Sequence, residues 1–334
     1  MKFLVIRFSS IGDIVLASPV WRCLKQQVST SEIHFLTKRS FAAVTEASPY
    51  IDKFFYFDNN TNDLIDELKK EDYDYVIDLH NNFRSNKIKR ALKKQSFTID
   101  KLNWQKFLLT KLRWNFMPGK HITSRSLATV EAFGVKDDGK GLDYFIPANG
   151  HISIEDLPAS HHAGYIALVI GASYATKKLP VFKLQELVTE IDFPIVLVGG
   201  KEDIAEGELV AAAAPGKVYN ACGKFSLHES ADIVRLSRLV ISHDTGLQYI
   251  ACAFNKPVVA VWGSTSPRLD VEPVYSAGQE KKYENIMVTG LSCQPCSKYG
   301  TKRCPLGHFK CMRNQDVKVI SRTAFELMAV NNHF

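Results

Sequence analysis

The sequence predicts an α/β protein built from two doubly wound domains, each with a parallel sheet. Short runs rich in β-branched and aromatic residues alternate with amphipathic stretches, which is the pattern of successive strand–helix units. The pattern is interrupted after about residue 80 and starts again near residue 160. The 334 residues are also enough for about two domains of roughly 150 residues each.

Apolar runs and helix-start signals place the expected elements. The run from Lys2 is the first strand, and Ser18-Pro19 is a typical start for the helix that follows it. Strands are expected at 2–8, 32–36, 75–79, 165–170, 194–198, 239–242 and 257–262. Helices are expected at 19–27, 40–47, 62–70, 182–191, 204–213, 230–237 and 247–254.

The interruption suggests where one domain ends and the next begins. The segment 84–125 is rich in Lys, Arg, Trp and Phe and contains no clear strand. The polar, irregular segment 149–163 is the expected linker. We therefore expect domains at 1–155 and 160–334, two αβα sandwiches facing each other across a cleft.

Composition excludes several classes of protein. Hydrophobic residues make up 46% and charged residues 23%, which is ordinary globular usage and rules out a disordered chain, a collagen-like repeat or a simple coiled coil. The net charge of +7 suggests an anionic partner without choosing among nucleic acid, phosphate ester and membrane surface. No apolar run reaches the ~18 residues of a membrane span, and Arg7 interrupts the run at the N-terminus. We expect a cytoplasmic protein.

Unusual residues stand at three expected strand ends, which is where open α/β sheets bind their ligands. After the first strand, Gly12 allows a sharp turn and Asp13 is either a helix N-cap or a carboxylate suited to act as a general base. In 171–180, Lys177 and Lys178 belong either to a phosphate cradle or to a solvated loop. Asp244-Thr245-Gly246 opens a helix. The start of this helix is either an anion-binding site or a helix terminus with Asp244 as an ordinary N-cap.

Other motifs narrow the choice of function. Neither a Walker P-loop nor G-x-G-x-x-G occurs, which removes the best evidence for a nicotinamide-dependent dehydrogenase. Asp-Thr-Gly occurs once, whereas an aspartic protease needs two such carboxylates. Asp72-Tyr73-Asp74 has the form of a D-x-D metal motif, but it precedes a strand, so we interpret it as a solvated turn.

Two segments leave alternatives open. In 84–116, basic residues alternate with aromatic ones, which suits a single-stranded nucleic acid, an anionic membrane or amphipathic helices that cap the domain. Near the C-terminus, four cysteines are compatible with a structural zinc site, free thiols or redox pairing: Cys293, Cys296, Cys304 and Cys311.

Four segments, in order along nearly the whole chain, resemble glycosyltransferase family 9, the ADP-heptose:lipopolysaccharide heptosyltransferases. They are KFLVIRFSSIGDIVLASPVWRCLKQ at 2–26, DLHNNFRS at 78–85, GASYATKKLP at 171–180 and SHDTGLQYIACAFNKPVVAVWGSTSP at 242–267. The resemblance implies the GT-B fold, which consists of two Rossmann-like domains with the active site between them.

The resemblance also implies residue roles. Asp13 matches the catalytic base, and Ser10 and Gly12 flank it on the acceptor side. Lys177 matches the lysine that holds the donor diphosphate. The other donor-site positions implied are Gly171, Ala172, Ser173, His228, Asp244, Thr245 and Gly246. His228 stands where several members have an acidic residue, Leu179 where many have Trp, and Tyr249 where many have His.

Together these features predict an inverting glycosyltransferase that moves a heptose or related sugar from an ADP-sugar to a lipopolysaccharide inner-core acceptor. Asp13 would take the acceptor's proton, and Lys177 with a helix N-terminus would stabilise the departing diphosphate, so that no cofactor is required. Arg84 is the first candidate contact for an acidic, lipid-linked acceptor. We expect peripheral contact with the anionic inner membrane and no specific nucleic acid. The alternative is a nucleotide- or nucleic-acid-binding module without transfer activity.

Overall fold

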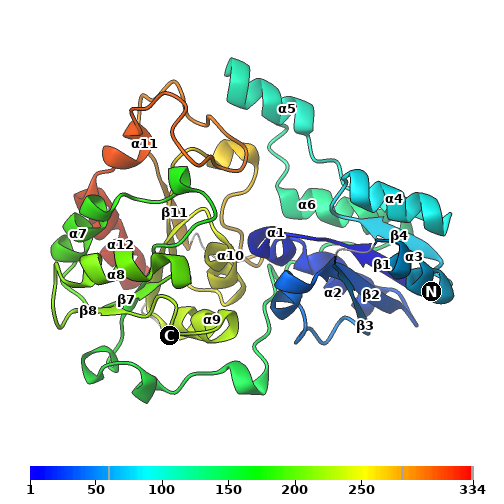
Figure 1. The fold of residues 1–334 in the computed structure, drawn as a ribbon, viewed down its shortest axis with the longest axis horizontal. Helices are drawn as coiled ribbons and strands as arrows, with labels where there is room; N and C mark the ends of the chain where they lie inside the picture. The colour runs from blue at the N-terminus through cyan, green and yellow to red at the C-terminus, as the bar shows by residue number, and fades with distance from the viewer. Residues whose placement is uncertain (59–60, 280–281, 332–334) are drawn as a thin grey trace. The chain divides into compact units, whose positions relative to one another are not determined.

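The computed structural model describes residues 1–58, 61–279 and 282–331 and divides the chain into two compact units. The first unit comprises Met1–Leu102 and Lys120–Phe145, and the second comprises Asn103–Gly119 and Ile146–Phe334. Each unit is an α/β structure with its own parallel sheet (Figure 1).

The division of the chain differs from the expected boundaries in two places. The second unit begins before the expected linker at 149–163, and it takes in 103–119, which the sequence had placed with the first domain. Hydrogen bonds explain the second difference, because Arg113 donates to the carbonyl of Pro295 and Lys298 donates to Asn103. The basic, aromatic segment 84–116 is thus divided between the units.

The first unit contains a five-stranded sheet in the order β3-β2-β1-β4-β5, with every neighbouring pair parallel. The strands are β1 Lys2–Ile6, β2 Glu32–Lys38, β3 Lys53–Phe57, β4 Tyr75–Asp78 and β5 Gln95–Thr98. The helices are α1 Ile11–Val15, α2 Ser18–Gln27, α3 Thr61–Lys70, α4 Phe83–Leu92 and α6 Ile122–Leu127. The apolar residues of β1 are completely buried, as a central parallel strand requires.

The second unit contains a six-stranded sheet in the order β11-β10-β9-β6-β7-β8, again parallel throughout. The strands are β6 Ile166–Val169, β7 Ile195–Val198, β8 Val218–Asn220, β9 Leu239–His243, β10 Val258–Val261 and β11 Tyr283–Ile286. The helices are α5 Asn103–Phe107, α7 Val181–Glu190, α8 Ile204–Ala211, α9 Leu227–Leu236, α10 Gly246–Ala253, α11 Lys310–Arg313 and α12 Val317–Asn331. Helices α7, α8 and α12 pack as one layer, and α9 packs beside α10.

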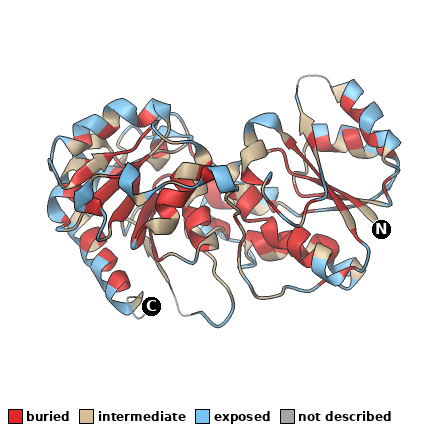
Figure 2. Ribbon diagram, turned by 90° about the horizontal axis from the view of Figure 1, so that it is seen from below, coloured by how far each residue is buried: buried red, intermediate tan, exposed pale blue. Residues whose placement is uncertain are grey.

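Burial follows the layers in each unit. The central strands are buried, whereas the outward faces of the helices are exposed, as Figure 2 shows. In the second unit a core cluster joins strand residues to the inner faces of α7, α8 and α12. Within the described part of the chain, no helix has both the length and the apolar composition needed to cross a membrane.

Several expected elements require correction. Helix 40–47 is a 3-10 helix over Arg39–Val44, and the segment said to lack a strand contains β5. Strands β3, β8 and β11 were also missed. All four missed strands are edge strands. β5, β8 and β11 are short and lack an apolar run, whereas β3 has one, Phe54–Phe57, that was overlooked.

The strand orders define a switch point in each sheet. In the first unit the chain runs outward from β1 in one direction through β2 and β3 and in the other through β4 and β5. In the second unit the corresponding pair is β6 and β9. Doubly wound sheets bind ligands beyond the carboxyl ends of the strands at such a point. The residues that follow β1, β4, β6 and β9 are therefore the ones to consider.

Candidate functional site

Asp13 lies in α1, just beyond the carboxyl end of β1, with its carboxylate held by two neighbours. Arg7 Nη2 lies 2.8 Å from one carboxylate oxygen. The backbone N–H and the hydroxyl of Ser10 donate to the other oxygen at 3.2 and 3.0 Å. Ser10 is the N-cap of α1 and Asp13 is the third helical residue, so Asp13 is neither an N-cap nor in a turn before the helix. Gly12, between them, is buried.

The environment of Asp13 keeps it ionised. Burial raises its pKa, but Arg7 and the hydrogen bonds from Ser10 outweigh burial and hold the pKa below the ordinary value of 3.8. The side chain nevertheless remains 40% exposed. An ionised and accessible carboxylate can accept a proton from a bound hydroxyl group.

Arg7 is a functional residue that sequence reasoning missed. Its side chain is 7% exposed, and its guanidinium also donates to the backbone carbonyls of Ser9 and Leu79. These bonds fix the guanidinium between the ends of β1 and β4, facing Asp13. Arg7 could have been identified from the sequence as a charged residue at the end of an otherwise apolar strand.

A cationic pocket of about 480 Å³ lies at the same edge of the first sheet. Lys38 ends β2, Arg39 follows it, and Arg84 lies in the first turn of α4, after β4. Arg39 forms an ion pair with Asp58 at 3.0 Å, and the Arg84 guanidinium lies 5.6 Å from the centre of the Phe57 ring. The structure thus brings Arg84 together with two further cations that the sequence did not single out.

Lys177 and Asp244 meet at the switch point of the second sheet. Lys177 Nζ lies 2.7 Å from Asp244 Oδ2, and the two side chains are 13% and 12% exposed. Thr265 donates to the same carboxylate at 2.9 Å, and the Tyr249 hydroxyl lies 3.2 Å from its other oxygen. Thr245, and not Asp244, is the N-cap of α10, and Gly246 is its first residue. Asp244 therefore positions Lys177 in front of the helix N-terminus, where an anion is favoured.

Lys178 turns away from that point. It forms ion pairs with Asp203 at 2.7 Å and with Glu206 at 2.5 Å. Asp203 is only 1% exposed. Its carboxylate lies so close to Gly171 that a Cβ on this glycine would fall 2.5 Å from a carboxylate oxygen. Gly171 is thus required for close packing at the end of β6. Ala172 is half-buried and Ser173 is exposed beside it, in the loop that leads to Lys177.

The loop that carries Lys177 is fixed by hydrogen bonds on both sides of the lysine. His243 Nε2 accepts the backbone N–H of Leu179 at 2.9 Å, and Thr176 Oγ1 lies 2.8 Å from the Ser264 hydroxyl. Burial, then Lys178 and Lys177, lower the pKa of His243 to about 3, so the ring is neutral and able to accept. His243 was also missed as a positioning residue, although it directly precedes Asp244. His228 lies in the first turn of α9, largely buried, after β8.

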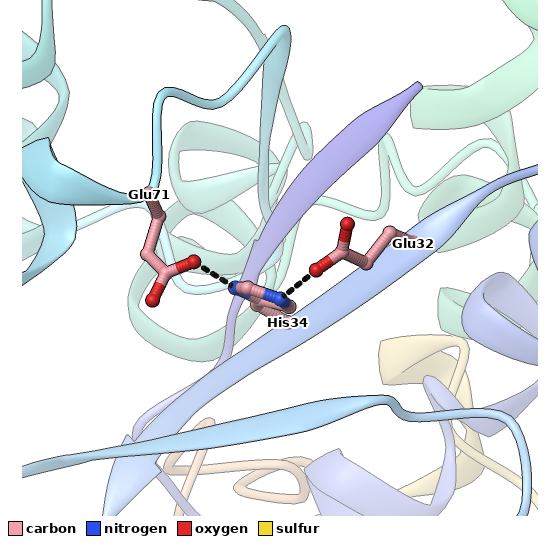
Figure 3. Close-up of side chains that lie close together, drawn as sticks. All are labelled: Glu32, His34 and Glu71. Carbon is pink, nitrogen blue, oxygen red and sulfur yellow. Dashed lines mark hydrogen bonds and ion pairs between the residues drawn. The ribbon is translucent and has the colours of Figure 1, made fainter.

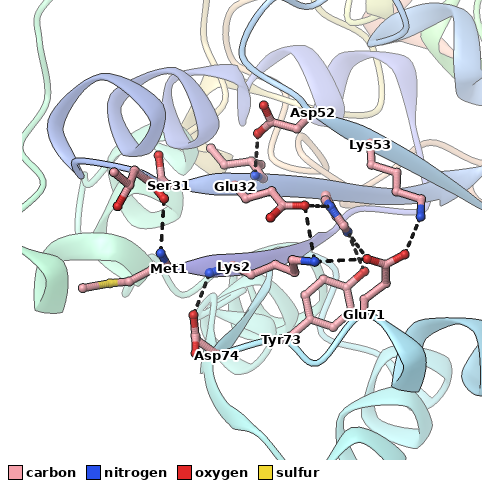
Figure 4. Close-up of polar contacts among 12 residues, drawn as sticks. Met1, Lys2, Ser31, Glu32, Asp52, Lys53, Glu71, Tyr73 and Asp74 are labelled. Atoms are coloured by element: carbon pink, nitrogen blue, oxygen red, sulfur yellow. Dashed lines mark hydrogen bonds and ion pairs between the residues drawn. The ribbon is translucent and has the colours of Figure 1, made fainter.

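A third cluster, Glu32, His34 and Glu71, has ligand atoms within 4.8 Å of one another (Figure 3), but it is an ion-pair network. Lys2 lies 3.3 Å from Glu32 and 3.2 Å from Glu71, and Lys53 also pairs with Glu71, so two lysines balance the two carboxylates (Figure 4). The cluster also lies at the amino ends of β1 and β2, opposite the switch point.

The D-x-D motif belongs to this structural edge. The Asp74 carboxylate accepts the backbone N–H of Lys2 at 2.7 Å, and Asp72 pairs with Lys94 at 2.7 Å. Tyr73 is buried, and its hydroxyl lies 3.0 Å from His34 Nδ1. The motif is thus a turn, as expected, although its tyrosine is in the core and not solvated.

Comparisons with known proteins give the family and the fold of this chain. A model of glycosyltransferase family 9 (heptosyltransferase) matches residues 62–306. Lipopolysaccharide heptosyltransferase 1 of Campylobacter coli is 26% identical over 87% of this chain and 90% of its own length. The structure of E. coli ADP-heptose lps heptosyltransferase II superposes with a TM-score of 0.74 at 17% identity, covering 99% of this chain and 100% of its own. E. coli heptosyltransferase WaaC with ADP-2-deoxy-2-fluoro heptose gives 0.69 at 18% identity, over 98% and 99%.

The fold class is therefore GT-B, with two Rossmann-like αβα units, as the sequence predicted. The chain belongs to glycosyltransferase family 9, whose model covers well over half of it. It is accordingly a glycosyltransferase. The ionisable residues at its two switch points are therefore candidates for the groups that act in sugar transfer.

Proposed function

We propose that the protein transfers a heptose from ADP-heptose to a lipopolysaccharide inner-core acceptor, with inversion at the anomeric carbon. The observation that carries the proposal is the placement of an ionised carboxylate, Asp13, at one switch point and a lysine at a helix N-terminus, Lys177, at the other. The names of the relatives supply the sugar and the acceptor class, and ADP is named in the solved structures of that fold.

The second unit would hold the donor. Lys177 and the free N–H groups at the start of α10 suit a diphosphate, which would compete with Asp244 for the ammonium group. As the bond between the anomeric carbon and the phosphate oxygen breaks, negative charge grows on the diphosphate. A fixed ammonium and a helix N-terminus stabilise that charge more strongly in the transition state than in the ground state.

The first unit would hold the acceptor. The pocket that contains Lys38, Arg39 and Arg84 suits the carboxylate or phosphate groups of an acidic sugar acceptor. The acceptor hydroxyl attacks the anomeric carbon, a new carbon–oxygen bond forms, the hydroxyl proton passes to Asp13, and ADP leaves. A single displacement with one carboxylate base inverts the anomeric configuration.

A lipid-linked acceptor would require contact with the inner face of the inner membrane. Along α4, Phe83 is 83% exposed and is followed on the same face by Lys87 and Arg90. In the second unit, exposed aromatic and aliphatic side chains lie among basic residues at 103–119; they are Trp104, Phe107, Leu112, Trp114 and Phe116. Basic residues beside exposed Trp and Phe favour peripheral attachment to an anionic surface. We propose that the protein works in the cytoplasm at this surface.

The test is a panel of ADP-, GDP- and UDP-sugars with truncated lipopolysaccharide acceptors, followed by nucleotide release. We expect ADP release only with ADP-heptose and only when acceptor is present. Asp13→Asn should reduce kcat by about 10² to 10⁴-fold while ADP affinity, measured by calorimetry, is unchanged. Asp66→Asn, which alters an exposed carboxylate on α3, is the matched control. A variant Asp13→Asn with more than about a tenth of the wild-type rate would remove Asp13 from the mechanism.

A further inference from the structure

Four cysteines and a histidine gather in the second unit, in and beyond the irregular connection between β11 and α11. They are Cys293, Cys296, Cys304, His308 and Cys311. The described residues between Ile286 and Lys310 form turns but neither helix nor strand, which is long for a connection inside a compact unit. Such a segment needs side-chain links to hold one conformation.

We propose that the four cysteine thiolates bind one thiophilic divalent cation of the zinc type, and that this metal fixes the connection against the loop that carries Lys177. All four cysteines are present as unbridged thiols. Cys311 lies within electrostatic range of the other three, and Cys296 of Cys293 and Cys304, so the four thiols share one region of the fold. His308 Nε2 lies in the same region, 3.8 Å from Cys293 Sγ. Four thiolates around one metal is a standard structural zinc site.

The surroundings of the thiols favour a soft metal. Between Asn285 and Asp316 the chain contains no carboxylate but five basic residues, so hard oxygen ligands are missing and the negative charge of a tetrathiolate site would be compensated. His308 Nδ1 accepts the backbone N–H of Lys310 at 3.0 Å, which leaves the ring proton on Nε2. That nitrogen lies 3.8 Å from Cys293 Sγ, where it can donate to a thiolate. His308 would thus orient a ligand and not be one.

Metal binding would tighten the connection. Within this described segment no three candidate ligand atoms lie within 4.8 Å of one another, whereas the sulfurs of a closed tetrahedral site lie about 4 Å apart. The cation would therefore draw the thiols inward. The turns between Cys296 and Cys304 contain no helix or strand that would resist this movement.

The same connection supports the donor loop directly. The backbone N–H of Thr301 donates to Thr176 Oγ1 at 2.8 Å, and the N–H of Thr176 donates to the Thr301 carbonyl at 3.2 Å. Gly300 lies so close that a Cβ there would fall 3.0 Å from the Lys177 side chain. Fixing the thiols therefore fixes the position of Lys177. This second part of the inference rests on the proposed function.

The first experiment measures metal on the intact protein, without reference to activity. We expect about one equivalent of zinc per chain, and Co²⁺ substitution should give the visible absorption of a tetrahedral thiolate site. Cys296→Ser and Cys304→Ser should each lose most of the metal, whereas Cys23→Ala, at a buried thiol in the first unit, should keep it. His308→Ala should retain the tetrathiolate spectrum with about 10- to 100-fold weaker affinity.

Two results would overturn the metal site. One is a soluble, folded protein that purifies without metal and, with its thiols reduced, takes up neither Zn²⁺ nor Co²⁺. The other is loss of metal in His308→Ala together with retention in Cys304→Ser, which would exclude a four-thiolate set.

The second experiment measures ADP affinity before and after removal of the metal. We expect the dissociation constant to rise several-fold when the metal is removed and to recover when Zn²⁺ is restored. An unchanged constant would overturn the link to Lys177 while leaving the metal site in place. If the metal-loaded protein binds no ADP at all, the proposed donor function fails, and the metal content still decides the site by itself.

Discussion

At the scale of single residues, Arg7 decides the charge of Asp13. The arginine is nearly buried and its guanidinium is held by two backbone carbonyls, so it cannot move away from the carboxylate without losing those bonds. Burial would raise the pKa of Asp13, but the charge and hydrogen bond of Arg7, together with the hydrogen bonds from Ser10, outweigh it. The Asp13 carboxylate is therefore held in its ionised form. In the mechanism that we propose, Arg7 would position this carboxylate as the base.

This predicts a shift in the pH profile of Arg7→Met. The pKa of Asp13 is lowered in the native protein, so wild-type kcat/KM should fall only when the pH drops below the ordinary range of a carboxyl group. Without the guanidinium the pKa of Asp13 rises, and the acid limb should move to higher pH. Rates measured from pH 4 to 8 would show it.

The Arg7 prediction has a clear contrary outcome. If Arg7→Met lowers the rate by the same factor at every pH, the arginine only supports the fold at this point. Arg322→Met, which removes an exposed cation that is paired with Glu326 on α12, is the matched control and should leave the acid limb in place.

Neighbouring lysines should give opposite phenotypes. Lys177→Ala should weaken ADP binding and lower kcat by about 10²-fold, because a charge at the diphosphate is lost, with little change in stability. Lys178→Ala should keep the kinetics but lower the free energy of unfolding by about 1 to 3 kcal/mol, because Asp203 stays buried without its ammonium partner.

Thermal unfolding and steady-state kinetics on both lysine variants separate the two effects. A stable but inactive Lys178→Ala, with a nearly normal Lys177→Ala, would mean that the roles in this loop are reversed.

At the scale of elements, burial explains which parts of the fold could be predicted from the sequence. Central strands such as β1, β6 and β9 are buried on both faces and read as continuous apolar runs. β5, with the sequence Gln-Ser-Phe-Thr, lies at an edge and is mostly exposed, so its hydrogen bonds to β4 and not its side chains define it. Hydrogen bonding of this kind leaves no pattern in a single sequence.

The residues of the candidate site also include some that the sequence indicated and others that it did not. Asp13, Lys177 and Asp244 were predicted as site residues because they follow apolar strands, where the switch-point rule places ligands, and because they match motifs of the family. Arg7 directly follows β1, and His243 is the last residue of β9. Lys38 ends β2 and Arg39 follows it, and this part of the sequence carries no recognisable motif. Their roles depend on which strands are neighbours, and that order is a property of the sheet and not of any local segment.

Helix α10 allows a prediction about metal dependence. In the donor site that we propose, Lys177 and the N-terminus of this helix would balance the charge of the diphosphate in place of a divalent cation. Transfer should therefore proceed in EDTA at close to the full rate, under conditions in which the metal content shows that any thiolate-bound zinc is retained. Strict dependence on added Mg²⁺ or Mn²⁺ by the folded protein would contradict this account of the donor site.

At the scale of the whole molecule, part of the excess positive charge is concentrated on helix α4. Lys87 and Arg90 are exposed and spaced by three residues, so they share a face of α4, and the exposed Lys93 is the C-cap of this helix. Lys89 is different, because it lies 2.8 Å from Asp78, which is fully buried at the end of β4. Lys94 pairs with Asp72. A test of membrane attachment must spare these two lysines, since removing Lys89 would leave a buried carboxylate without its partner.

Neutralising Lys87, Arg90 and Lys93 together with Gln should weaken binding to anionic vesicles. Each basic residue near such a surface contributes roughly 1 kcal/mol, so the triple variant should bind about 100-fold more weakly at low salt, and the wild type should be released at high salt. KM for an acceptor presented in vesicles should rise, while KM for the donor and the melting temperature stay the same. Lys136, Lys201 and Lys310, which are exposed cations outside α4, provide the matched triple control. If the α4 variant sediments with vesicles as the wild type does, this face of the helix serves solubility alone. Attachment would then have to come from the exposed aromatic residues of 103–119.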